Sequence, residues 1–196
     1  MKKKEERSVQ LPTIEQVEAE RNRLRYKRRY NRTLKSTIAI LVVVAALAVL
    51  VATLWMPVLQ IYGSSMDSTL KDGEIVLSVK NSDFNQGDVV SFYYNNKILV
   101  KRVIAGPGDW VNIDQDGNVY VNNELLYEPY VIDKALGECD IELPYQVPDG
   151  KIFVMGDHRS TSVDSRNNAV GCVGEEQVVG KIIFRVWPLN RIGTVG

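Results

Sequence analysis

A run of 19 uncharged residues, Ile38 to Met56, constrains the fold of this chain more than any other feature of its sequence. The run reads IAILVVVAALAVLVATLWM. A helix of about 20 apolar residues crosses the roughly 30 Å hydrocarbon core of a bilayer with its backbone polar groups hydrogen-bonded internally. Trp55 falls at the outer end, where an aromatic ring suits the membrane interface. We therefore predict a transmembrane helix over residues 37–57.

Two other interpretations of this run fit less well. A buried helix of a soluble protein is one alternative, and it fits poorly because no polar face interrupts residues 38–56. A cleaved signal peptide has an apolar core of about 7–15 residues and then a small-residue cleavage site of the A-x-A kind. This run is longer and is not closed by such a site. We expect the helix to be retained.

The charges beside the run predict its orientation. Residues 1–36 hold 12 of the 24 basic residues and 5 of the 24 acidic ones, so they carry +7 and the remainder carries −7. Positive flanks stay cytoplasmic, which places the N-terminus inside and residues 58–196 outside. The stretch RNRLRYKRRYNRTLK has eight basic residues and no acidic one, so RNA binding is an alternative. Beside a spanning helix we favour orientation and attraction to anionic lipid, and expect no nucleic-acid partner.

After Pro57 the pattern changes to short β-branched runs separated by turns. We predict tight turns at Asn95-Asn96 and Asp116-Gly117. Residues 127–149 have no clear pattern and are expected to form a loop. Strands are predicted over 74–80, 88–94, 97–105, 110–114, 118–126, 151–157 and 178–188. The predicted fold is mostly β, with one N-terminal transmembrane helix followed by an antiparallel β-sheet or folded-barrel domain.

These patterns divide the chain into three expected parts: a basic cytoplasmic segment over 1–36, the transmembrane helix over 37–57 and an outer domain over 58–196. The outer domain holds both cysteines, Cys139 and Cys172, which either form one disulfide or remain free thiols. One histidine and two scattered cysteines supply no recognisable ligand spacing, so no metal or other cofactor is expected.

Three polar segments stand out from the β pattern and are candidates for chemistry. They are YGSSMDSTLK (62–71), VKRVIAGPGD (100–109) and MGDHRSTSVDSR (155–166). A serine hydroxyl needs a neighbouring base before it acts as a nucleophile. That base is either His158, the single histidine, or a lysine whose amine burial keeps neutral.

Lys101 suits the role of a buried base because apolar residues surround it in ILVKRVIA. Side chains alternate along a strand, so Lys101 and Arg102 point to opposite faces, and only one of them enters an apolar site. The residues alone also allow a simpler interpretation. A lysine in a strand is usually solvated, and a segment rich in Asp and Ser usually forms a polar turn.

In this order and behind one membrane helix, the three segments resemble the motifs of bacterial type I signal peptidases, the membrane-anchored Ser–Lys proteases. GSSMDSTLKDGEIVLSVK is similar to the family's nucleophile motif and VKRVIAGPGD to its lysine motif. MGDHRSTSVDSR is similar to its Gly-Asp-Asn-Arg … Asp-Ser-Arg motif. The similarity covers about residues 55–187, and the compact chain resembles the short, single-helix Gram-positive form.

The resemblance implies a role for each matching residue. Ser65 would be the nucleophile and Lys101 the general base, with Ser162 orienting the lysine amine. Ser65 and Gly63 would form the oxyanion hole through backbone N–H groups. The supporting residues of the motifs would be Met66, Asp157, Arg159, Asp164 and Arg166. The strands that hold the substrate would contribute Leu59, Ile61, Tyr62, Leu99 and Val100.

Three residues depart from the family pattern. Ser68 stands where proline is usual, which we expect to loosen a turn. His158 replaces the usual asparagine, and we interpret it as a structural substitution because a base must reach the proton of the nucleophile. Gly63 stands where some members have a second oxyanion-hole serine, as in the Gram-positive pattern.

The function implied by the resemblance is removal of signal peptides from exported preproteins, at the cell membrane and outside the cytoplasm. A preprotein would bind as an extended strand, with small apolar pockets for the alanine-like residues of an A-x-A site. One alternative is an autoproteolytic repressor-type Ser–Lys protease, but a spanning helix stands where its DNA-binding domain belongs. Another is a non-housekeeping or inactive homologue acting as a membrane-anchored assembly factor, for example in pilus assembly. The expected partners are preproteins and the lipid bilayer.

Overall fold

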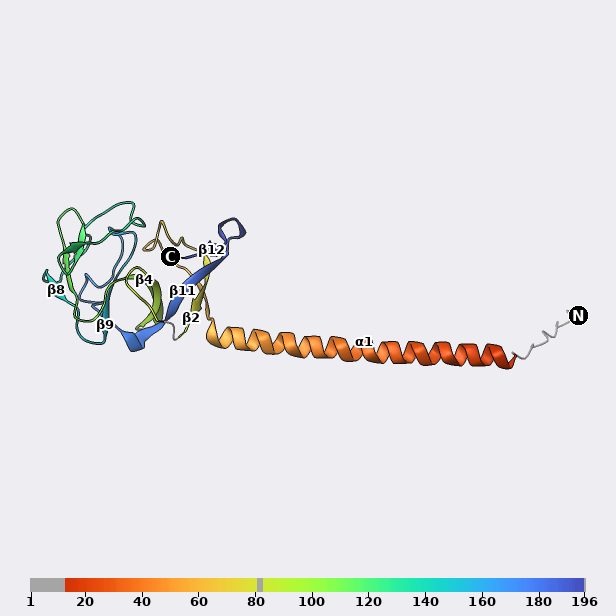
Figure 1. The fold of residues 1–196 in the computed structure, drawn as a ribbon. Helices are drawn as coiled ribbons and strands as arrows, with labels where there is room; N and C mark the ends of the chain where they lie inside the picture. The colour runs from red at the N-terminus through yellow and green to blue at the C-terminus, as the bar shows by residue number, and fades with distance from the viewer. Residues whose placement is uncertain (1–12, 81–82, 196) are drawn as a thin grey trace, which may run out of the picture. The chain divides into compact units, whose positions relative to one another are not determined.

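The computed structural model describes residues 13–80 and 83–195, and the chain divides into two compact units, residues 1–51 and 52–196 (Figure 1). Helix α1 runs from Ile14 to Trp55 and ends shortly before Pro57, which disfavours a continued helix. Its 42 residues contain no glycine or proline, so the helix is unbroken. Among the described residues it is the one helix long and apolar enough to cross a membrane.

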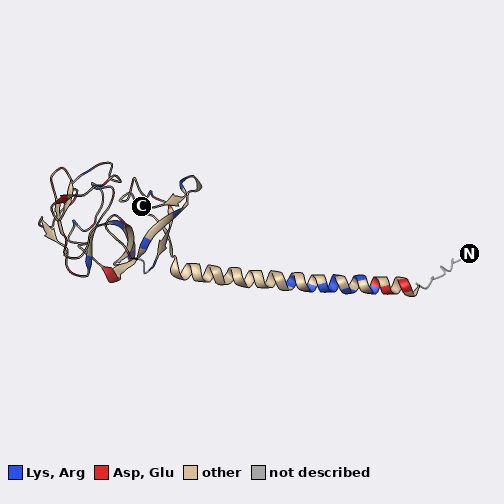
Figure 2. Ribbon diagram, viewed as in Figure 1, with Lys and Arg blue, Asp and Glu red and all other residues tan. Residues whose placement is uncertain are grey.

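The helix is longer than the sequence predicted. It extends for roughly 63 Å at 1.5 Å per residue, about twice the thickness of the hydrocarbon core. Lys and Arg residues cluster in its first half and uncharged residues fill its second half (Figure 2). The basic stretch and the apolar run belong to one helix, so the boundary expected at residue 36 falls within α1. Residues 1–12 of the predicted basic segment lie outside the described residues.

The rest of the described chain forms two antiparallel sheets. In the larger sheet the strand order is β1-β2-β11-β3-β4-β9-β10, and β12 also pairs with β11. Its strands are β1 (Val58–Gln60), β2 (Ile75–Val79), β3 (Val89–Tyr94), β4 (Lys97–Ala105), β9 (Lys151–Met155), β10 (Val173–Gly174), β11 (Val178–Trp187) and β12 (Gly193–Thr194). The smaller sheet has the order β7-β6-β5-β8. Its strands are β5 (Trp110–Ile113), β6 (Val119–Val121), β7 (Glu124–Leu125) and β8 (Tyr145–Gln146). Two short 3₁₀ helices, Glu175–Gln177 and Leu189–Arg191, flank β11.

The predicted turns and most of the longer predicted strands are confirmed, but the strand predicted over 118–126 is wrong. The chain reverses at Asn122-Asn123, both at positive φ, so that β6 and β7 pair with each other as a short hairpin. β3 and β4 form a hairpin around Asn95-Asn96, with Tyr94 paired to Lys97 and Asn95 at φ 51°. The turn between β5 and β6 contains Gly117 at φ 79°, where a Cβ atom would lie 2.4 Å from the backbone nitrogen of Ala135. Only glycine fits that left-handed, crowded position.

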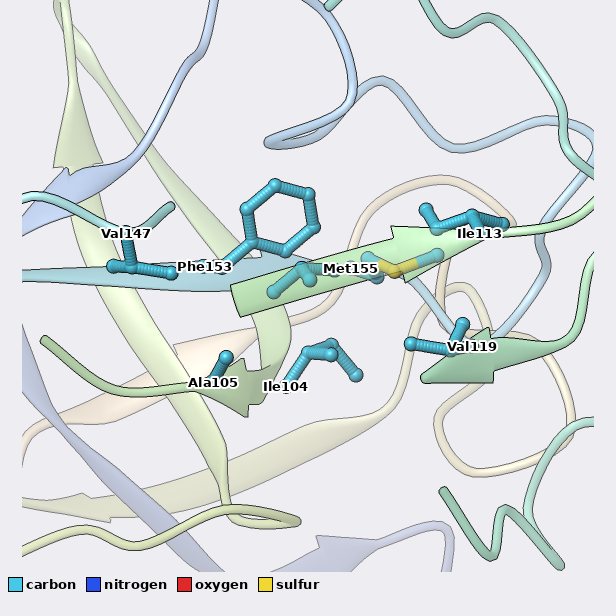
Figure 3. Close-up of a cluster of buried hydrophobic side chains, with 8 residues drawn as sticks. Ile104, Ala105, Ile113, Val119, Val147, Phe153 and Met155 are labelled. Carbon is cyan, nitrogen blue, oxygen red and sulfur yellow. The ribbon is translucent and has the colours of Figure 1, made fainter. Parts of the chain in front are cut away.

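Hydrophobic clusters join these elements and fix the strands that carry the polar segments. The largest packs the smaller sheet against the ends of β4 and β9 (Figure 3). Its buried residues are Ile104, Ala105, Val111, Ile113, Val119, Val147, Phe153 and Met155. A second cluster buries Met66 and Leu70 together with Val76 of β2 and Ile182 of β11. It anchors the segment after β1 to the larger sheet.

Candidate active site

Ser65 lies in a tight turn between β1 and β2. The N–H of Asp67 donates to the carbonyl of Ser64 at 3.0 Å, and the N–H of Leu70 donates to the carbonyl of Met66 at 2.8 Å. Met66 and Leu70 are buried on the inner side of this turn, with exposed fractions of 2% and 0%. The turn is therefore held by two apolar anchors, one of which directly follows Ser65.

The side chain of Lys101 reaches this turn from β4. Its Nζ lies 2.6 Å from Oγ of Ser65, although the two residues are 36 positions apart in sequence. Lys101 is only 3% exposed. Burial lowers the pKa of its amine from 10.5 to about 8, with the charge of Asp164 opposing this shift and that of Arg166 adding to it. The structure thus pairs a serine hydroxyl with a lysine that deprotonates far more readily than a solvated one.

Arg102, the next residue of β4, is also buried but serves a different purpose. Its Nε and NH2 atoms donate to the two carboxylate oxygens of Asp157 at 2.9 and 2.7 Å. It also donates to the carbonyl of Gly87 and to Oγ1 of Thr69. The two basic side chains point oppositely, as predicted, and Arg102 ties β4 to both the Ser65 turn and the segment that contains Asp157.

The segment 156–166 packs directly against the Ser65 turn. The N–H of His158 donates to the carbonyl of Ser65 at 3.1 Å. At Gly156 a Cβ atom would lie 2.4 Å from that same carbonyl oxygen, so glycine allows the two backbones to approach. Four charged residues of the segment have exposed fractions of 2% or less: Asp157, Arg159, Asp164 and Arg166.

Asp164 and Arg166 form a buried pair next to Lys101. Nε of Arg166 donates to the Asp164 carboxylate at 2.8 Å, and the N–H of Gly156 donates to it at 2.9 Å. Although burial opposes ionisation, the hydrogen bonds and charge of Arg166 hold the pKa of the Asp164 carboxyl below its usual value. The pair therefore places one negative and one positive charge near the amine of Lys101, and their effects on its pKa oppose each other.

Ser162 and Gly63 lie at the site with contacts that differ from those expected. The hydroxyl of Ser162 is buried and makes no well-formed hydrogen bond with a described residue, although it helps to lower the pKa of Asp164. The N–H of Gly63 donates to the carboxylate of Asp72 at 2.7 Å. Because that donor is occupied, the N–H of Ser65 is the better candidate for an oxyanion hole, and the expectation for Gly63 does not fit this conformation.

Two other departures from the family pattern have clear structural consequences. Ser68 adopts φ 86°, which the ring of proline forbids, and its hydroxyl donates to the carbonyl of Tyr130 at 2.6 Å. The turn is tied by this residue and not loosened, contrary to our expectation. Nδ1 of His158 lies 3.3 Å from the carbonyl of Ser64 and so contacts the turn through its backbone.

Glu128 and Tyr130 belong to the site but were not predicted. The carboxylate of Glu128 forms an ion pair with Arg159, and neither side chain is exposed. The ring of Tyr130 lies over the guanidinium of Arg102, 3.8 Å from its carbon to the ring centroid. Both residues lie in the unpatterned stretch 127–149. The one feature of the sequence that could have indicated them is an acidic residue between two tyrosines, in YEPY (127–130).

Two pockets flank Ser65, and both are lined by β4 and by residues that follow β1. A small pocket of about 80 Å³ lies between residues 60–62 and residues 98–101. Residues that line only this pocket include Ile61, Met66, Ile98 and Val100. A large pocket of about 390 Å³ lies on the other side. Residues that line only the large pocket include Tyr94, Lys97, Thr161, Val163 and Val170. Tyr62, Ser65, Leu99 and Lys101 border both, while Leu59 packs against the second hydrophobic cluster.

Other candidate chemistry finds no support in the described chain. Residues 13–80 and 83–195 contain no group of three or more His, Cys, Asp or Glu side chains that could hold a metal ion. Cys139 and Cys172 are both free thiols, which decides between the two alternatives left open by the sequence. Burial, the largest influence, raises the pKa of the Cys172 thiol. The serine and lysine pair is therefore the arrangement with evident reactivity.

This chain is similar to several known proteins. A family model described as "Signal peptidase, peptidase S26" matches residues 34–187. Signal peptidase IB of Staphylococcus aureus (strain Mu50) is 40% identical over 151 residues, covering 67% of this chain and 78% of that protein. Signal peptidase I of Bacillus licheniformis is 36% identical over 167 residues, covering 79% and 88%. A crystal structure of a signal peptidase I from Enterococcus faecalis V583 covers 51% of this chain and 97% of that chain, with 28% identity and a TM-score of 0.42.

Proposed function

We propose that Ser65 and Lys101 are the catalytic dyad with which this chain cleaves preproteins. The chain belongs to the S26 family of signal peptidases. As a member of that family the protein is a serine peptidase that removes N-terminal signal peptides. The alternative of an inactive assembly factor is not favoured. The observation that carries the residue assignment is the 2.6 Å separation of Lys101 Nζ and Ser65 Oγ at a buried position.

The chemistry follows from the lowered pKa of Lys101. In its neutral form the amine accepts the proton of Ser65 Oγ, and the oxygen attacks the scissile carbonyl carbon. The N–H of Ser65 stabilises the resulting oxyanion. The C–N bond then breaks, and the ammonium of Lys101 returns its proton to the leaving amine. Water, activated by the same amine, hydrolyses the acyl ester and regenerates Ser65.

The surrounding residues keep this pair in place. The buried side chain of Met66 anchors the turn in the hydrophobic core. Asp157 accepts hydrogen bonds from Thr69 of the turn and Arg102 of β4, and so holds the two together. We assign Ser162 to orienting the lysine amine. A buried hydroxyl without a well-formed hydrogen bond costs folding free energy, and such groups are found where they have a function. Asp164, Arg166 and Arg159 support the segment that carries it.

Helix α1 would anchor the protein in the cell membrane. Its apolar half fits one crossing of the bilayer, and its basic half fits the cytoplasmic side. The catalytic unit would then lie outside the cytoplasm. The preprotein's own apolar segment would lie in the same bilayer. Confinement to one membrane raises the effective concentration of the substrate without any new contact.

The pH dependence of cleavage tests this proposal. Below a pKa of about 8 the amine of Lys101 is protonated and cannot accept a proton, so activity should fall as pH falls. We expect kcat/KM for a preprotein with a defined A-x-A site to drop about tenfold per pH unit below that value and to level off above it. Rates of the full chain in detergent micelles, with N-terminal sequencing of the product, provide the measurement. An inert wild type, or constant activity from pH 6 to 9, would contradict the assignment.

A further inference from the structure

A peptide substrate can bind as an extended strand beside Ser65, between β1 and β4. Along residues 97–101, β4 pairs with β3 on one side, and its pairing with β9 begins only at Arg102. β1 lies at the end of the larger sheet and pairs with β2. Each strand thus offers an edge that is unpaired within the described sheet, and an extended peptide between them can form main-chain hydrogen bonds.

The two pockets receive alternate side chains of such a peptide. Successive side chains of an extended strand point in opposite directions. If the residues at −1 and −3 relative to the cleaved bond enter the small pocket, the residue at −2 faces the large one. The volumes fit this arrangement, since about 80 Å³ suits alanine-like side chains and about 390 Å³ admits a long one.

The charge of the large pocket is one-sided. Among the described residues that line it, the ionisable cations are Lys97 and Lys101, and none is a carboxylate. Lys101 is neutral when it acts as the base, so Lys97 is the charge that remains. Lys97 is exposed at the start of β4 and makes no ion pair with any described residue. Its amine is therefore available to a bound substrate.

We propose that Lys97 determines specificity at the −2 position of the substrate and selects preproteins with an acidic side chain there. This inference rests on the proposed function, since it assumes cleavage by Ser65. Tyr62 and Val163, both exposed, provide apolar walls that cover the stem of the −2 side chain and leave its carboxylate facing Lys97. A basic side chain at −2 would meet a like charge in the same pocket and bind more weakly.

A charge-swap experiment tests the inference. Three preproteins that differ only in Asp, Asn or Lys at −2 of an A-x-A site are cleaved by the full chain in uncharged detergent at low salt. For the wild type we expect kcat/KM to be roughly fivefold higher for Asp than for Lys, with Asn between them, the size typical of an exposed charge pair. Lys97→Met should remove the preference, Lys97→Glu should reverse it, and 0.5 M salt should suppress it.

The control is Lys151→Glu, which makes the same charge change at an exposed lysine of β9 that borders neither pocket. It should keep the wild-type preference. The inference is overturned if Lys97→Glu retains that preference, or if the wild type cleaves all three substrates equally. Failure to cleave any of the three would instead overturn the proposed function.

Discussion

Replacing Lys101 with methionine should lower kcat for preprotein cleavage by about 10³–10⁴-fold, because the loss of a catalytic base leaves only substrate binding and oxyanion stabilisation. Methionine has a similar length and no charge, so it fits a position that is 3% exposed. Burial of the amine already costs free energy, as its lowered pKa indicates, and the variant should therefore unfold no more readily than the wild type.

The measurement is the single-turnover rate of the full chain in detergent micelles, together with its thermal unfolding. Lys151→Met is the matched control, since it exchanges an exposed lysine outside the site and should keep wild-type activity. A folded Lys101→Met protein that retains a tenth or more of the activity would show that another group acts as the base, and His158 would then be the first to examine.

Replacing Glu128 with glutamine should reduce the free energy of unfolding by about 3–5 kcal/mol, the usual cost of leaving a buried charge without its partner. The ion pair between Glu128 and Arg159 has no exposed surface on either side chain. Arg159 also donates to the carbonyl of Gly156, beside the Ser65 turn. The damage should therefore reach the active site as well as the overall stability.

Urea unfolding of the full chain in detergent micelles gives this quantity. The matched control is Glu124→Gln, because Glu124 is an exposed residue of the same domain and its replacement should change stability by less than about 0.5 kcal/mol. If Glu128→Gln loses less than 1 kcal/mol, the stretch 127–131 does not stabilise the site in the way its contacts suggest.

The longer strands were predictable because their signal is local. β4 carries nine residues of apolar and β-branched character, and its bounds match the prediction of residues 97–105. The strands β8, β10 and β12 have two residues each, which is too short for any alternation to be visible. The length of α1 was missed for a different reason: a polar, highly charged sequence stays helical when it continues a helix that is already formed.

The candidate site was only partly predictable. Alternation along β4 correctly separated Lys101 from Arg102, but the sequence does not indicate that the lysine meets Ser65, since the fold brings that contact about. The resemblance to signal peptidases supplied it. Glu128 and the occupied N–H of Gly63 depend on partners 31 and 9 residues away, and no short motif encodes either. Ser68 shows the same limit, because its φ of 86° is a property of the folded turn.

Ser65, and not its neighbour Ser64, is proposed to attack the substrate. The most direct test is the rate of preprotein cleavage by Ser65→Ala beside Ser64→Ala, both in the full chain and both verified as folded. Oγ of Ser65 lies against the amine of Lys101, whereas Ser64 is exposed and contacts His158 through its carbonyl. We expect Ser65→Ala to lose at least about 10³-fold in kcat and Ser64→Ala to remain within about tenfold of wild type. Equal losses in the two variants, or a folded and active Ser65→Ala protein, would contradict the Ser65–Lys101 mechanism.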